Sequence, residues 1–197
     1  YAVWACATRP YSTSWAMGTS TNPNWTTDWS EFVIYEPITD VNFQTAVNLW
    51  FSDEANATFT YGHISDWNTS AVTNMFEAFE NRSDFNENIS GWDTSNVWTM
   101  SQMFLNASSF NQNIGNWDVS KVRQMAHMFN GAEAFNQDIG DWNTSDLNYA
   151  PYMFVRARRF NQDISGWDMS KVTAFNNFFK EADNFNQDLG KWDTSSA

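Results

Sequence analysis

The chain is poor in the residues that build metal sites, disulfides and most catalytic centres. Its 197 residues include one cysteine, Cys6, and two histidines, His63 and His127. A single cysteine excludes an intrachain disulfide framework and a zinc site made of several cysteines. The chain also lacks a Gly-rich phosphate loop, an H-E-x-x-H motif and a G-x-S-x-G motif. We therefore expect a protein that is not an enzyme.

Positive charge is scarce as well. The chain has 10 Lys and Arg against 23 Asp and Glu, which gives a formal net charge of −13. Proteins bind nucleic acids and anionic membranes through clustered basic residues, so we expect neither as a partner of this chain. A membrane-spanning helix needs roughly 18 or more consecutive apolar residues. The sequence contains no such run, and we expect no transmembrane segment.

Aromatic residues, in contrast, are abundant and regularly spaced. The chain has 12 Trp and 17 Phe, and from Trp67 onward many of them recur at intervals of 25 residues. A fixed period of this length is typical of stacked repeats that share one continuous core. The expected repeat core is formed by Trp67, Trp92, Trp117, Trp142, Trp167 and Trp192, together with Phe85, Phe110, Phe135, Phe160 and Phe185.

Two hydrophobic patterns alternate within each repeat. Apolar residues at helical spacing, from Val122 through Met125 and Phe129, predict a helical segment. The segment 139–142 predicts a short strand. The fold class is therefore an α/β repeat solenoid that is leucine-rich-repeat-like, with one short strand and one helical segment per 25-residue coil. Pro151 interrupts the pattern, so the helix of that coil is expected to be shifted, kinked or replaced by a turn.

The chain divides into three parts. Residues 1–37 form a Trp-rich N-terminal segment, which is either part of a cap or an aromatic sugar-binding surface. Residues 38–60 form a helical cap, in which Phe43, Ala46, Val47 and Trp50 are expected to face inward. Residues 61–197 form a solenoid of about five repeats that ends in the middle of a repeat. The helical cap belongs to the N-terminal capping region that a solenoid needs.

The repeat consensus F-N-Q-D-I-G-x-W-D-x-S-x-V-x-x-M resembles the BspA-like leucine-rich-repeat surface proteins, also described as DUF285 repeats. The resemblance covers about residues 60–197. It implies a secreted or cell-surface protein used in adhesion, with extracellular proteins or glycans as partners and no catalytic residues. A structural alternative is a subunit of a surface filament or layer, assembled head-to-tail through the uncapped end of the solenoid.

The repeat period also predicts contacts between coils. Oppositely charged side chains that are 25 residues apart should meet, which predicts inter-coil ion pairs Glu133–Arg158–Asp183 and Arg156–Glu181. Exposed pairs of this kind contribute only about 0–1 kcal/mol each. The alternative is that the arginines of this region form a basic docking spot on an otherwise acidic protein.

Columns of polar residues run alongside the apolar ones. Asparagine and aspartate recur at Asn86, Asn111, Asn136, Asn161 and Asn186, and at Asn68, Asp93, Asp118, Asn143, Asp168 and Asp193. We expect these side chains to bond backbone groups at each bend, and we expect no cofactor. Ca²⁺ held by the acidic columns is the alternative. A second alternative is an ice-binding array built from Thr69, Thr94, Thr144 and Thr194, a column that Val119 and Met169 interrupt.

Several N-x-S/T sequons permit glycosylation of an extracellular protein. The candidate sites are Asn24, Asn56, Asn81, Asn106 and Asn88. Asn81 and Asn106 align with each other on one outer face and are the better candidates. Asn68 and Asn143 belong to a structural column, so a bonded or buried amide would make them poorer acceptors.

Overall fold

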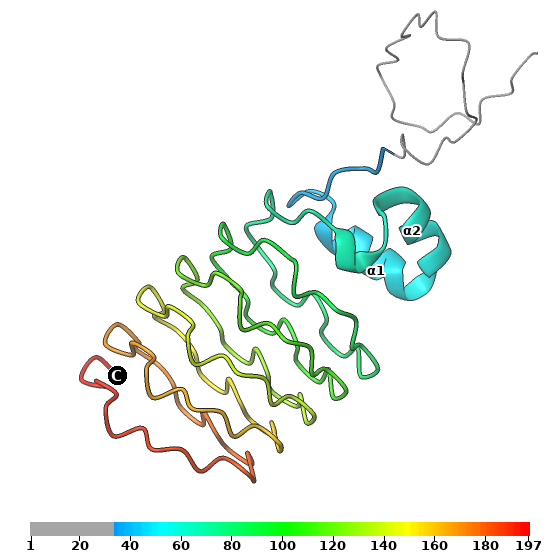
Figure 1. Ribbon diagram of the computed structural model, residues 1–197. Helices are drawn as coiled ribbons and strands as arrows, with labels where there is room; N and C mark the ends of the chain where they lie inside the picture. Colours follow the sequence, from blue (N-terminus) through cyan, green and yellow to red (C-terminus); the bar gives the residue numbers. More distant parts are fainter. Residues whose placement is uncertain (1–33) are drawn as a thin grey trace, which may run out of the picture. The chain divides into compact units, whose positions relative to one another are not determined.

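The computed structural model describes residues 34–197, so Cys6, Asn24 and nearly all of the Trp-rich segment 1–37 lie outside the described residues. The regular elements in this part are the helices α1 (Phe43–Ser52) and α2 (Glu54–Tyr61) and a short 3₁₀ helix, η2 (Ile64–Asp66). The rest of the described chain runs in successive coils that lie side by side, starting next to the two helices and ending at the C-terminus (Figure 1).

Helix α1 packs against the aromatic interior of the coils at the N-terminal end of the stack. Its four buried residues are the four that the helical spacing predicts, namely Phe43, Ala46, Val47 and Trp50. Phe43 contacts the Trp92 ring edge-on at 5.7 Å, and Trp50 contacts the Trp67 ring in the same way at 6.4 Å. The apolar stripe of α1 therefore closes one end of the aromatic core, so the predicted inward-facing helix is confirmed.

Helix α2 follows α1 after one residue, Asp53. The Asp53 carboxylate accepts a hydrogen bond from the Asn56 backbone N–H at 3.1 Å and so caps the start of α2. Glu54 adds negative charge to the first turn, where the helix dipole favours it. Only Ala57 and Tyr61 of this helix are buried. The sequence of α2 is therefore weakly amphipathic, and local capping defines the helix more clearly than hydrophobic spacing does.

The predicted α/β repeat solenoid is wrong. Between residue 67 and residue 197 the described chain contains neither an α-helix nor a β-strand, so the expected leucine-rich-repeat type of coil is not formed. The coils contact one another through single parallel bridges inside the segment predicted to be helical, at Asn74–Thr99, Thr99–Gln124, Gln124–Tyr149 and Tyr149–Ala174. The segment predicted to be a strand holds a turn, in which the Trp142 N–H donates to the Ile139 carbonyl at 3.3 Å.

The helix prediction fails because residues three and four apart also share a side in consecutive β-turns. The Met128 N–H donates to the Met125 carbonyl at 3.2 Å, and His127 between them has φ 56°. A positive φ at the third residue is the mark of a type II turn and has no place in an α-helix. In the next coil Pro151 precedes Tyr152, which has φ 59°. Proline is favoured at that second turn position, so Pro151 belongs to the turn instead of disturbing a helix.

The same left-handed conformation recurs at two positions of each coil. The residues with positive φ are Glu77, Asn81, Gln102, Asn106, His127, Gly131, Tyr152, Arg156, Asn177 and Glu181. All but one carry a side chain, and such residues adopt this conformation at a cost of about 1–2 kcal/mol each. Interactions between the coils must therefore over-determine the backbone at these positions.

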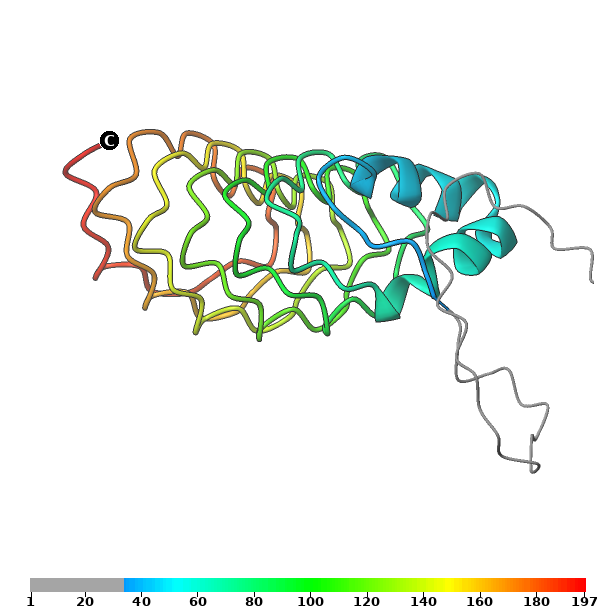
Figure 2. The same ribbon diagram turned by 90° about the horizontal axis from the view of Figure 1, so that it is seen from above.

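Hydrogen bonds between coils supply that constraint. Along the turn segment of the third coil, the N–H groups of Met125 and Phe129 donate to the carbonyls of Tyr149 and Met153 in the next coil, both at 2.9 Å. The Met128 N–H instead closes the turn within its own coil. From Met128 onward, backbone N–H groups thus alternate along the segment: one closes a turn within its own coil, and the following one donates to the next coil. The backbone is satisfied without a helix or a regular strand, and the coils stay in register (Figure 2).

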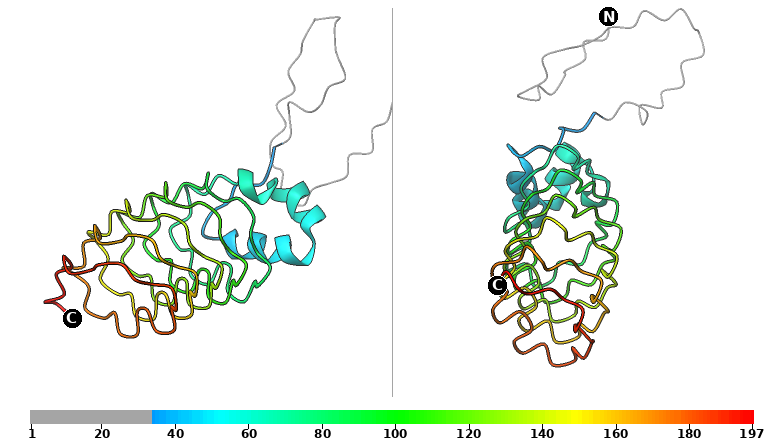
Figure 3. Two further views of the ribbon diagram at one scale, coloured as in Figure 1. Left: turned by 60° about the horizontal axis from the view of Figure 1, so that its bottom comes forward. Right: turned by 90° about the vertical axis from the view of Figure 1, so that its left-hand side faces the viewer.

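Stacked aromatic side chains fill the inside of the coils, which overlie one another when seen along the stack (Figure 3, right). The ring of Phe129 stacks between the phenylalanine rings of the preceding and following coils, with centroid distances of 5.6 and 5.4 Å. The Trp117 indole N–H donates to the Ile89 carbonyl at 3.2 Å. The expected core residues are buried in this way, except that Phe185 and Trp192 are only partly buried.

Candidate binding groove

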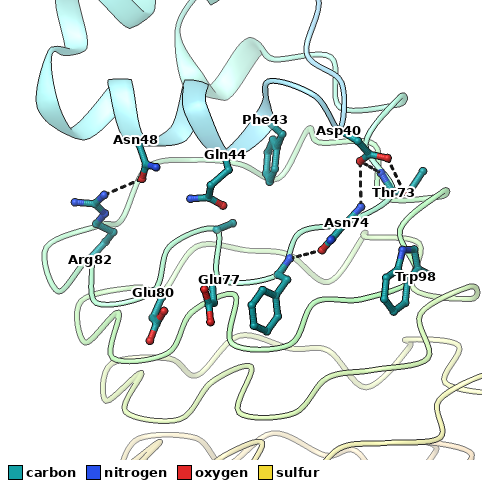
Figure 4. Close-up of a pocket in the computed structure, with 12 residues that line it drawn as sticks. Asp40, Phe43, Gln44, Asn48, Thr73, Asn74, Glu77, Glu80, Arg82 and Trp98 are labelled. Atoms are coloured by element: carbon teal, nitrogen blue, oxygen red, sulfur yellow. Dashed lines mark hydrogen bonds between the residues drawn. The ribbon is translucent and has the colours of Figure 1, made fainter.

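A groove of about 630 Å³ lies between helix α1 and the first two coils. This volume falls in the range of typical ligand sites. The helix contributes Gln44 and Asn48 to one wall, and the coils contribute Glu77, Glu80 and Trp98 to the other. Figure 4 shows Gln44 and Asn48 on the helix, and Glu77, Glu80 and Trp98 along the coils opposite it. The groove therefore joins a helical wall to a wall of stacked turns.

Asp40 fixes one end of the groove. Its carboxylate accepts hydrogen bonds from the Thr73 backbone N–H and hydroxyl, both at 2.7 Å, and from the Asn74 N–H at 3.3 Å. Desolvation raises the pKa of Asp40, but these hydrogen bonds outweigh it and hold the pKa below its ordinary value. Asp40 therefore stays ionised near neutral pH and ties the start of α1 to the first coil.

Two aromatic side chains stand partly exposed in the coil wall. Phe76 is 41% exposed and Trp98 is 42% exposed. Neither belongs to the buried aromatic columns. The residues that replace Phe76 in later coils are Ser101, Ala126, Pro151 and Asn176, and those that align with Trp98 are Thr73, Arg123, Asn148 and Thr173. Since the repeat does not require an aromatic residue at either position, both rings are available to contact a ligand.

Two carboxylates, Glu77 and Glu80, line the same groove. Partial burial raises the pKa of Glu77, and the neighbouring Glu80 carboxylate raises it further. None of the ion pairs formed within residues 34–197 involves Glu77 or Glu80. The two side chains accept no hydrogen bond from another described residue, so both can accept bonds from a bound molecule.

Arg82 is the basic residue of the groove wall, and it is already engaged. Its Nη2 donates to the Asn48 side-chain oxygen at 3.1 Å, and its guanidinium lies 4.4 Å from the centre of the Phe51 ring. Arg82 and Asn48 sit at the opposite end of the groove from Trp98 (Figure 4). The rest of the groove lining thus presents aromatic surface, free carboxylates and amides, which suits a ligand with hydrogen-bond donors.

Comparison with known proteins places these coils in a family. The family described as "Mycoplasma protein of unknown function, DUF285" matches residues 45–158 and residues 113–197. The chain belongs to the DUF285 family. No curated protein and no solved structure matches it. The DUF285 match covers α1 from its third residue onward, α2 and every coil, so the groove is built largely from the matched segment.

The DUF285 coils bring the expected ion-pair residues together. Arg158 lies 3.7 Å from Glu133 in the preceding coil and 3.7 Å from Asp183 in the following one. The Arg156 Nε donates to Glu181 at 2.8 Å. All five side chains are at least 42% exposed. Solvent screening limits each pair to about 0–1 kcal/mol, so the ladder adjusts the stacking of the coils without dominating it.

The polar columns bond the backbone of the DUF285 coils. The Asn136 side-chain oxygen accepts from the Asn161 N–H of the next coil at 2.9 Å, and the same bond joins each pair of neighbours from Asn86 to Asn186. In the other column, the Asp118 carboxylate accepts from the Ser120 N–H at 2.9 Å. Among residues 34–197, no three His, Cys, Asp or Glu side chains gather in an arrangement that could hold a metal ion.

The threonine column lies inside the coils. Thr69, Thr94 and Thr144 are 0–2% exposed, and only Thr194 in the last described coil is exposed. The hydroxyl of each buried threonine donates to the carbonyl 24 residues later, as Thr94 does to the Asp118 carbonyl at 2.9 Å. These threonines therefore hold neighbouring coils together. They cannot form the exposed flat array that ice binding requires.

The sequons of the DUF285 coils differ in how their amides are used. The Asn106 Nδ2 donates to the Asn81 side-chain oxygen at 2.9 Å, so these stacked amides bond each other. The Asn68 and Asn143 side chains are exposed and accept from the serine N–H two residues later, and their Nδ2 atoms make no described bond. From the sequence, Asn81 and Asn106 rank above Asn68 and Asn143 as glycan acceptors. Burial does not support that ranking, because Asn68 and Asn143 are exposed. Asn56 in α2 and Asn88, which precedes a turn, are also exposed.

Sequence reasoning missed the groove. Glu77, Glu80 and Trp98 lie at repeat positions whose residues vary from coil to coil, and Gln44 and Asn48 are exposed positions of a helix expected only as a cap. The available signal was Trp98, which is a tryptophan outside the 25-residue tryptophan column. In the described part of the chain, no helix has the length and apolar character of a membrane span.

Proposed function

We propose that this DUF285 protein is a non-enzymatic, secreted or cell-surface protein that binds extracellular proteins or glycans. The groove beside α1 is its binding site. The observation that carries the proposal is the pair of exposed rings, Phe76 and Trp98, at positions where the repeat needs no aromatic residue. Exposed aromatic surface beside unpaired polar groups favours binding of a partner that has both apolar and polar faces.

The stacked coils support this function by being rigid. Their backbone groups are bonded along the stack, and their aromatic columns are packed, so the groove is formed before a ligand arrives. A preformed site loses less conformational entropy on binding than a flexible one. The resemblance of the repeat to BspA-like surface proteins supports a role in adhesion and a location at the cell surface.

The test is a binding screen of the full chain against glycan and peptide arrays, run in parallel with Trp98→Ala. Tyr149→Ala is the matched control, because Tyr149 is 44% exposed and does not line the groove. We expect some ligands to bind the wild type and the Tyr149 variant with equal affinity. The same ligands should bind the Trp98 variant at least about fivefold more weakly. Binding that survives Trp98→Ala unchanged would show that the groove is not the site.

Assembly into a filament or layer is the structural alternative. It predicts regular fibres in electron micrographs of the full chain, whereas a binding module gives separate particles. The two functions can therefore be distinguished before any ligand is known.

A further inference from the structure

The charge distribution of the groove narrows the class of ligand. The chain carries a net charge of −13, and two of its carboxylates, Glu77 and Glu80, line the groove and have no ion-pair partner within residues 34–197. These two like charges repel each other. A cationic group placed between them would remove this repulsion and would gain attraction from both.

The exposed rings favour the same kind of ligand. Phe76 is adjacent to Glu77 in the chain, and Trp98 lines the same groove from the next coil. An ammonium or guanidinium group that lies over an aromatic ring is attracted to the electron-rich face, most strongly for tryptophan. The protein already shows this contact at the groove wall, where the Arg82 guanidinium lies 4.4 Å from the centre of the Phe51 ring.

Building on the proposed function, we propose that the groove is a docking site for a basic peptide segment of a partner protein. One lysine or arginine side chain of the partner lies between Glu77 and Glu80, and neighbouring residues of the peptide pack on Phe76 and Trp98. Gln44 on α1 faces the same space and offers an amide to the main chain of the peptide (Figure 4).

A neutral glycan fits the aromatic rings but not the charges. Its hydroxyl groups can bond a carboxylate, yet they leave two unbalanced negative charges enclosed beneath the ligand, where their repulsion is stronger than in open solvent. A peptide with positive charge satisfies both features together. Charge complementarity therefore favours the basic peptide as the occupant.

The experiment is isothermal titration of the full chain with a heptapeptide that has three arginines separated by glycines and blocked ends. A second heptapeptide has glutamine in place of each arginine, and cellohexaose and chitohexaose serve as neutral glycan probes. The test variant is Glu77→Gln with Glu80→Gln. Glutamine already occupies the equivalent left-handed position at Gln102, which has φ 59°, so the exchange at Glu77 fits the fold.

The control variant, Glu87→Gln with Asp141→Asn, removes two exposed carboxylates away from the groove and so matches the change in net charge. We expect the arginine peptide to bind the wild type and the control alike, and to lose about tenfold or more in affinity with the test variant. Trp98→Ala should weaken binding by about fivefold. Raising the salt concentration from 50 to 500 mM should weaken it as well, because screening reduces the attraction.

The opposite results separate the two proposals. Equal loss of peptide binding in the test and control variants would show a non-specific charge effect and would overturn the basic-peptide site. Binding of a neutral glycan that depends on Trp98 but not on Glu77 and Glu80 would also overturn it, while the proposed function would stand. If no probe distinguishes Trp98→Ala from the wild type, both proposals fail. Circular dichroism and thermal unfolding of every variant confirm that the fold is intact.

Discussion

Replacing Asn136 by alanine tests whether the asparagine column holds the coils together. The Asn136 side-chain oxygen accepts two hydrogen bonds from the next coil, from the Asn161 N–H and from the Gln162 Nε2, both at 2.9 Å. Alanine removes the acceptor for both. A neutral hydrogen bond contributes about 0.5–1.5 kcal/mol net. Asn161 is exposed, so water can replace part of the loss, and the expected destabilisation is about 1–2 kcal/mol.

The matched control lies in the same column. Asn186 occupies the same repeat position, and its own N–H donates to the Asn161 side chain at 2.9 Å. Its side-chain oxygen accepts no hydrogen bond from another residue in the described part of the chain. Asn186→Ala therefore makes the same chemical change, in the same turn, without breaking a bond between coils. The expected effect is within about 0.5 kcal/mol.

Urea unfolding and thermal unfolding, both followed by tryptophan fluorescence, measure both variants. For a chain of this size, a loss of about 1–2 kcal/mol lowers the melting temperature by about 3–6 °C. The comparison cancels the intrinsic preference of alanine for the turn, because both positions have the same place in the repeat. Equal losses for Asn136→Ala and Asn186→Ala would refute the idea that the column acts through bonds between coils.

Two further predictions concern the core and the turns. Trp117→Ala should lower the free energy of unfolding by about 3–5 kcal/mol, because Trp117 is 4% exposed and its indole N–H bonds the Ile89 carbonyl. Trp98→Ala at the surface should lower it by less than about 1 kcal/mol. Thermal unfolding measures both variants. Hydrogen bonds from the Ser120 hydroxyl and N–H lower the pKa of Asp118 in the folded protein. The ionised Asp118 carboxylate therefore stabilises the fold fully above the pKa of the unfolded chain, which is about 4. This stabilisation is lost as the pH falls through the lower pKa of the folded protein. Asp118→Asn should keep the turn at pH 7 and should reduce the loss of stability between pH 5 and pH 2, as measured by urea unfolding at each pH.

The parts of the fold that follow from hydrophobic burial could be predicted from the sequence. The inward residues of α1, such as Phe43 and Trp50, are the buried ones. The 25-residue columns of Trp117 and Phe129 lie inside the coils. In each case the apolar spacing fixes which side chains must share the interior, whatever backbone conformation brings them there. Spacing identifies the core more reliably than it identifies the secondary structure around the core.

The backbone of the coils could not be predicted in the same way. Apolar residues three and four positions apart, as at Met125, Met128 and Phe129, lie on one side of a helix and also on one side of two consecutive type II turns. The distinction depends on residues with positive φ, and glycine marks such a position only at Gly131 within the coils. Elsewhere the conformation is imposed by bonds to the next coil, which is tertiary information. Gly131 and Pro151 are the local signals for these turns.

The groove was hidden from sequence reasoning for a related reason. Repeat analysis explains a residue by its column, so it directs attention to positions that recur and away from those that do not. Phe76, Glu77 and Trp98 are at positions where the coils differ. Phe76 and Glu77 are adjacent in the chain, but Trp98 lines the same groove only because the next coil stacks on theirs beside α1. A departure from the column is therefore informative in this chain when it adds an exposed ring or an unpaired charge. The same criterion sets apart the exposed Tyr149, which lies outside the groove and aligns with Asn74, Thr99 and Gln124 in the earlier coils. If Tyr149→Ala weakens ligand binding as much as Trp98→Ala does, the binding surface extends along the turns beyond α1, and the groove is only its first part.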